Sequence, residues 1–194
     1  MSVYTDGLLK GNFMRIAFLI LIALLVLSAF IGIGVILFGS FDGTEIRILA
    51  TCGVLGAYTA LITPSLFHIK RSRALYLTRI AIVTTSGTLA MILWLIWGSE
   101  PIGGGTYFRV LASLGILAVA TNHSLILLAT QSGKLMVKIC QRTTVIIIVL
   151  VTGLFLGAIW NDGLPEPVLR IFLALVILDV LGSLATPILV KSGR

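Results

Sequence analysis

Charge is what this sequence has least of. Charged residues make up 11% of its 194 positions, whereas hydrophobic residues make up 58%. A soluble domain is normally about a quarter charged, so the shortage excludes a soluble globular fold. The uncharged runs approach roughly 20 residues, the length that crosses a hydrocarbon core of about 30 Å. The chain is therefore expected to be an integral membrane protein.

Cysteine and catalytic motifs are also scarce. The only two cysteines, Cys52 and Cys140, are predicted to lie near opposite faces of the membrane, which excludes an intrachain disulfide. The sequence has no paired carboxylates and no HExxH, CxxC or GxSxG motif. We therefore expect no enzymatic activity and no metal site.

Six apolar runs separated by short polar turns occupy most of the chain. They predict an all-α fold with one membrane domain covering residues 1–194. The expected transmembrane helices cover residues 16–38, 46–67, 80–97, 108–130, 143–160 and 168–190.

The distribution of charge predicts the orientation. The amino end, the second and fourth loops and the carboxyl end hold eleven of the 14 Lys and Arg, with Asp6 as their only acid. The other three loops hold five of the seven acids. Short loops rich in Lys and Arg stay on the cytoplasmic side. We expect a multi-pass protein of the cell inner (plasma) membrane with both termini cytoplasmic.

The spacing of arginines predicts an internal threefold repeat. The arginines before the odd helices are 64 and 63 residues apart, and those at the outer ends of the even helices are 62 and 61 apart. These six residues are Arg15, Arg79 and Arg142, and Arg47, Arg109 and Arg170. Helices three and five both end in Ile-Trp, and helices two and six both contain Thr-Pro. Regular self-similarity indicates duplication. We predict three tandem parallel helical hairpins, with repeat units of about 15–78, 79–141 and 142–194.

Several residues have structural interpretations. Pro64 and Pro187 should kink helices two and six or end their regular hydrogen bonding. A loop acid precedes each outer arginine and can pair with it, the three acids being Glu45, Glu100 and Glu166. Small residues four apart, including Gly153 and Gly157, favour helix packing within the chain over a homodimer face.

The net charge of +7 points to an anionic partner. Because the basic residues lie in short loops between apolar runs, we expect anionic lipid headgroups and no nucleic acid. The headgroup contacts are expected at Lys70, Arg71, Arg73 and Arg79.

Three polar residues inside the predicted helices form the candidate site. Asp179 lies nine residues past Arg170, about 13 Å below the outer end at 1.5 Å per residue. An ionised side chain there costs about 2.5–3.5 kcal/mol, so it should face protein or water. Asn122 and His123 lie one to two turns deeper on helix four, so a direct pair with Asp179 needs helix tilt or a bridging water. These residues are either a proton, cation or ligand site or polar contacts between helices.

A haem between His68 and His123 is the sharpest cofactor hypothesis, but it is not expected. The repeat places His68 seven residues, about 10 Å, deeper than His123, which suits one porphyrin poorly. We expect no cofactor.

These features lead to two functional hypotheses. The first is a non-enzymatic integral subunit or accessory scaffold, packed against other membrane proteins or itself. The alternative is a small channel or transporter that uses Asp179, Asn122 and His123.

Overall fold

The computed structural model describes residues 25–39, 42–69, 75–98, 103–129 and 135–191, together with residues 19, 22 and 23. The described chain is helical apart from its turns. The helices are Leu25–Phe38, α2 (Gly43–Ile69), α3 (Leu75–Trp97), α4 (Gly105–Ala129), α5 (Leu135–Trp160) and α6 (Glu166–Lys191).

The helices confirm the expected all-α, six-helix membrane bundle. Helices α2 to α6 are each long and apolar enough to span a membrane, and Leu25–Phe38 is a shorter apolar helix. The first helix was predicted to begin at residue 16, but most of residues 16–24 lie outside the described part of the chain.

Two helix starts differ from the prediction by five residues or more. Helix α3 begins at Leu75 and α5 at Leu135, five and eight residues before the expected positions. Arg79, Lys138 and Arg142 therefore lie inside helices, whereas the prediction began these two helices directly after Arg79 and Arg142. Long basic side chains can reach the headgroups from the first turns of a transmembrane helix, so a charge there does not end it.

Local sequence explains where two of the helices begin and end. The carboxylate of Asp42 accepts from the backbone N–H groups of Thr44 and Glu45, at 3.2 and 3.1 Å, and caps α2. Helix α5 ends where Asp162 adopts a left-handed φ of 56° and the Gly163 N–H donates to the Ala158 carbonyl at 2.9 Å. This bond closes a Schellman turn.

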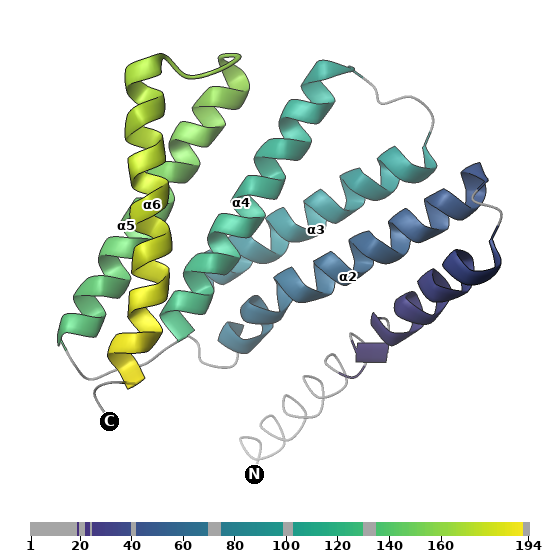
Figure 1. Ribbon diagram of the computed structural model, residues 1–194, viewed down its shortest axis with the longest axis horizontal. Helices are drawn as coiled ribbons and strands as arrows, with labels where there is room; N and C mark the ends of the chain where they lie inside the picture. Colours follow the sequence, from purple (N-terminus) through teal and green to yellow (C-terminus); the bar gives the residue numbers. More distant parts are fainter. Residues whose placement is uncertain are drawn as a thin grey trace, which may run out of the picture.

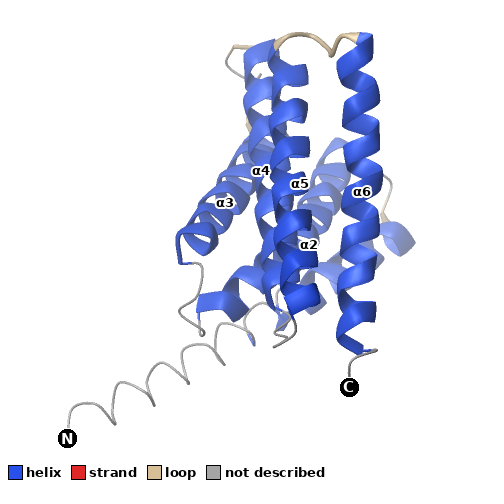
Figure 2. Cartoon of the chain, turned by 90° about the vertical axis from the view of Figure 1, so that its left-hand side faces the viewer, coloured by secondary structure: helices blue, strands red, loops and turns tan. Residues whose placement is uncertain are grey.

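The helices form an open row rather than a closed ring (Figure 1). Helix α4 lies in the middle and packs against α2, α3 and α5. Helix α6 packs on α5 at one edge, as Figure 2 also shows, and Leu25–Phe38 lies beside α2 at the other edge. Within the most apolar stretch of each helix, α4 has the largest buried share, 33%, and α6 has none. The one buried side chain described in α6 is Thr186, near the end of the helix.

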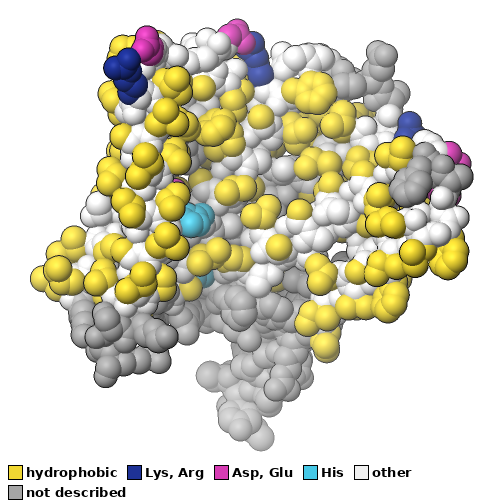
Figure 3. All heavy atoms as spheres, in the orientation of Figure 1, with side chains coloured by type: hydrophobic (Ala, Val, Ile, Leu, Met, Phe, Trp, Pro, Cys, Tyr) yellow, Lys and Arg dark blue, Asp and Glu magenta, His cyan; other side chains and the backbone are white. Residues whose placement is uncertain are grey.

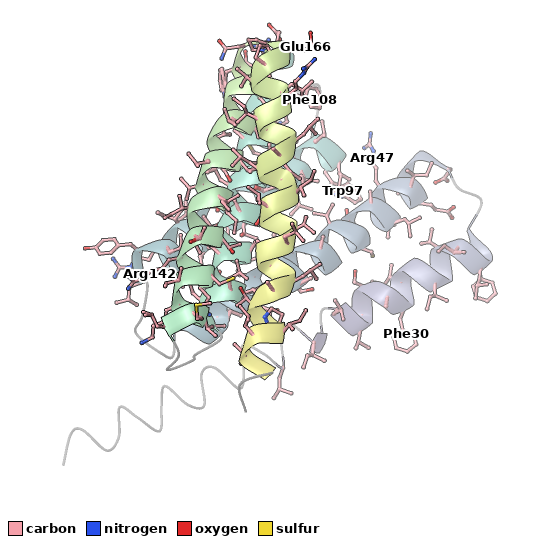
Figure 4. All side chains as sticks on the ribbon, turned by 60° about the vertical axis from the view of Figure 1, so that its left-hand side comes forward. Phe30, Arg47, Trp97, Phe108, Arg142 and Glu166 are labelled. Atoms are coloured by element: carbon pink, nitrogen blue, oxygen red, sulfur yellow. The ribbon has the colours of Figure 1, made fainter. Side chains whose placement is uncertain are left out.

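On the face that Figure 3 shows, the visible Lys, Arg, Asp and Glu side chains lie along the upper edge of the molecule, and the surface below them is mostly hydrophobic. Arg47, Trp97, Phe108 and Glu166 lie toward one end of the bundle and Arg142 toward the other (Figure 4). This separation suits a bilayer, where aromatic and charged side chains lie at the interfaces.

Two equivalent hydrogen bonds join successive hairpins. The indole Nε1 of Trp97 donates to Thr51 on α2 at 2.9 Å, and that of Trp160 donates to Ser113 on α4 at 3.2 Å. Each hydroxyl lies four residues after the outer arginine of its helix, and each tryptophan lies 18 residues after the leading arginine of its own. We call these two bonds the tryptophan latches. Each joins an odd helix to the preceding even helix.

The prolines do not end their helices. Pro64 lies inside α2 and Pro187 inside α6, and both helices continue past them. The carbonyl of Pro64 accepts a contact from the His68 ring at 3.1 Å, one turn further along.

The expected packing through small residues is wrong at the positions we chose. A Cβ added at Gly153 or Gly157 would meet nothing within 4 Å in the described part of the chain, so no described helix packs tightly against these two glycines. The tight approach is elsewhere: a Cβ at Gly182 of α6 would lie 2.2 Å from Oγ1 of Thr144 on α5. A small residue permits close packing but does not show which face is packed.

Candidate functional site

The structure brings His123 and Asp179 together across α4 and α6. His123 Nε2 lies 3.8 Å from Asp179 Oδ1 and 2.8 Å from the hydroxyl of Ser183. That hydroxyl donates to Asp179 Oδ1 at 3.4 Å. A serine has one proton, so while it donates to Asp179 it accepts from the Nε2–H of His123. The three side chains form a short hydrogen-bonded relay inside the predicted membrane span.

The sequence analysis did not include the side chain of Ser183 in the candidate site. It lies four residues after Asp179, the spacing that places two side chains on one face of a helix. Ser183 supplies the bridge for which we had invoked a water. The i, i+4 spacing was therefore a usable signal.

Asn122 belongs to a different cluster, although it precedes His123 in sequence. Its Oδ1 accepts from Ser65 of α2 at 2.7 Å, and its Nδ2 donates to Thr85 of α3 at 3.0 Å and to the Ala118 carbonyl at 2.8 Å. Asn122 and Ser65 are 1% and 0% exposed. Adjacent residues on a helix point about 100° apart, so Asn122 contacts α2 and α3 whereas His123 contacts α6. Two of the three candidate residues therefore meet and the third does not.

A groove ends at the His123–Asp179 pair. It has a volume of about 390 Å³ and lies between α4, α5 and α6. Its walls are mostly apolar, and the lining residues are Gly115, Ile116, Val119, Ala120, His123, Ile148, Val151, Thr152, Phe155 and Asp179. In Figure 3 a histidine ring is visible within an otherwise hydrophobic surface. The side chains of His123 and Asp179 are 37% and 23% exposed, so the chain itself covers most of the pair and leaves a part of each side chain accessible.

The other candidate residues lie apart from this groove. His68 is buried at 4% exposure and contacts a carbonyl of its own helix, whereas His123 contacts α6. Lys70, Arg71 and Arg73 lie outside the described residues, and Arg79 lies in α3. The described part of the chain contains no group of three or more His, Cys, Asp or Glu arranged to hold a metal ion.

The outer arginines pair in two ways. Arg170 contacts Glu166 at 2.6 Å within α6, as expected. Arg109 contacts Asp162 in the next hairpin at 2.6 Å, whereas its expected partner Glu100 lies outside the described residues. The Arg109 contact adds a second link between successive hairpins on the side where the Trp160 latch lies.

In comparison with known proteins, no protein-family model, curated protein or solved structure matches the chain.

Proposed function

We propose that the chain is a non-enzymatic integral subunit or scaffold that packs against other membrane proteins in the bilayer. The observation that carries this proposal is the open row of helices. Helix α6 and the Leu25–Phe38 helix lie at opposite edges of the described bundle, and Thr186 is the only buried side chain described in α6. Two edges that no described helix covers offer long helical surfaces for association, which in lipid depends on packing and hydrogen bonds between helices.

The tryptophan latches support an open row built from three quasi-equivalent hairpins. A third latch would close the row by joining α6 to the first helix. The equivalent positions are Ala174, four residues after Arg170, and Ile33, 64 residues before Trp97. Neither side chain can form the hydrogen bond. The chain therefore has the latch at both internal junctions and lacks it at the junction that would close a ring.

The competing hypothesis of a channel or transporter has less support. It depended on Asp179, Asn122 and His123 lining one path, and Asn122 instead joins α2, α3 and α4 with both amide atoms bonded. The paired residues lie at the end of a groove within one hairpin-to-hairpin junction.

Extraction directly from the membrane into lipid nanodiscs tests the docking role. The proposal predicts a complex of defined composition, larger than one chain, containing a second membrane protein or further copies of this one. If this detergent-free extraction recovers only the isolated chain, the result contradicts the proposed docking role.

A further inference from the structure

The two polar residues that line the end of the groove, His123 and Asp179, each keep one polar atom without a partner in the described part of the chain. The relay occupies Nε2 of His123 and Oδ1 of Asp179, and it leaves Nδ1 of His123 and Oδ2 of Asp179 without a hydrogen bond. Both residues line the groove. Hydrocarbon cannot satisfy such atoms, so a molecule that brings its own hydrogen-bonding group is favoured there.

The rest of the groove suits an apolar body. From His123 to Gly115 is eight residues, so the α4 wall is about 12 Å long at 1.5 Å per residue. Ile148, Val151 and Phe155 of α5 line the groove along a similar length. With a volume of about 390 Å³, it can hold one hydrocarbon chain or a small ring system with its polar group at the His123 end.

The chemistry of the relay selects the polar group. When Ser183 donates to Asp179, neutral His123 presents an unprotonated Nδ1 and Asp179 presents a carboxylate oxygen, so both free atoms accept. When the relay runs in the opposite direction, the acid is protonated and His123 Nδ1 carries a proton. A hydroxyl can donate and accept, and so it fits both states. A carbonyl can only accept, and a charged headgroup at this depth faces the same desolvation cost as a charged side chain.

We propose that the groove between α4, α5 and α6 binds a bilayer-soluble alcohol, with its hydroxyl on His123 and Asp179 and its hydrocarbon body along α5. This site does not depend on the proposed docking role, because the chain purified alone contains the whole groove.

Competition photolabelling of the wild-type protein in nanodiscs tests the site. The probe is a long-chain alcohol carrying a diazirine, and the competitors are unlabelled dodecanol and dodecane. The proposal predicts labels on residues 115–120 and 148–155, and a competition by dodecanol about tenfold better than that by dodecane. The factor corresponds to one or two hydrogen bonds formed in an apolar site.

Three results overturn the proposal. Equal competition by the two compounds means that the groove takes any hydrocarbon chain, including the acyl chain of a phospholipid. Labels outside the groove mean that the alcohol binds elsewhere. A transmembrane helix of another protein crosslinked inside the groove, in protein extracted directly from the membrane, means that a partner occupies it.

Matched variants test whether the preference for dodecanol over dodecane depends on the His123–Ser183–Asp179 relay. In His123→Leu and Asp179→Leu, dodecanol should compete no better than dodecane, while labelling by a hydrocarbon diazirine continues and shows that the groove is intact. Thr152→Val is the control, because Thr152 lines the same groove but its hydroxyl donates to the Ile148 carbonyl of its own helix at 2.7 Å. This variant should keep the tenfold preference. Retention of the preference in both leucine variants would contradict the proposal.

Discussion

The close approach of α5 and α6 at Gly182 makes a sharp prediction about stability. In Gly182→Ala the new Cβ would lie 2.2 Å from Oγ1 of Thr144, 3.0 Å from its Cγ2 and 3.1 Å from its Cβ. Thr144 is 2% exposed and its hydroxyl donates to the Cys140 carbonyl at 2.9 Å, so it has little room to move. Overpacking of this kind typically costs about 1–3 kcal/mol.

Gly153→Ala is the matched control, because a Cβ there meets nothing within 4 Å. Both substitutions gain about 1 kcal/mol of helix propensity at most, so this gain cancels in the comparison. Gly182→Ala should therefore lower the free energy of unfolding by about 1–3 kcal/mol relative to Gly153→Ala, measured by reversible unfolding in mixed micelles.

A second substitution separates the clash from other effects. In the double variant with Thr144→Ala, the Oγ1 and Cγ2 contacts disappear and only the 3.1 Å contact with Cβ remains. The double variant should recover most of the loss, which a double-mutant cycle reports as a coupling energy. If Gly182→Ala is as stable as Gly153→Ala, the α5–α6 packing described above is wrong.

Three further predictions concern the bundle and its orientation. Asn122→Leu should lower the free energy of unfolding by about 1–2 kcal/mol, because the buried Ser65 hydroxyl on α2 loses its acceptor and the Thr85 hydroxyl on α3 loses one donor; an unchanged unfolding curve would show that this cluster does not hold the helices together. Trp97→Phe and Trp160→Phe should each cost about 0.5–1 kcal/mol, with additive effects in the double variant, and losses that differ by more than about 1 kcal/mol would contradict equivalent latches. In a cysteine-free background, a membrane-impermeant maleimide should label Asp162→Cys but not Lys138→Cys in intact cells, and the opposite pattern would reverse the predicted orientation.

The sequence alone predicted which segments form helices, but it did not predict which face of each helix packs against which neighbour. Apolar run length and charge placement gave the six helices, because hydrocarbon thickness and desolvation act on each helix separately. Helix starts at Leu75 and Leu135 were missed because basic side chains are tolerated in the first turns. Counting residues from the helix ends placed His123 and Asp179 at depths within about two turns of each other. Depth does not determine how a helix is rotated about its axis, so it could not predict whether the two side chains face each other.

Rotation and packing partners depend on the whole bundle. Asn122 and His123 are adjacent in sequence yet bond to different helices, Asn122 to α2 and His123 to α6. Likewise, Gly153 and Gly182 are both glycines in transmembrane helices, and only Gly182 is packed against a neighbour. No local pattern separates these cases, because side-chain contacts are decided by which helices become neighbours.

The most direct test of the docking role is site-specific photocrosslinking in native membranes from the exposed edge of the row. A photoreactive residue placed at Ile177 or Leu184 of α6, which are 61% and 60% exposed, would report what covers that edge. Val83 on α3, 69% exposed within the row, is the control. The account predicts one reproducible membrane-protein adduct, identified by mass spectrometry, from the α6 positions and not from Val83. Lipid adducts alone from all three positions would contradict it.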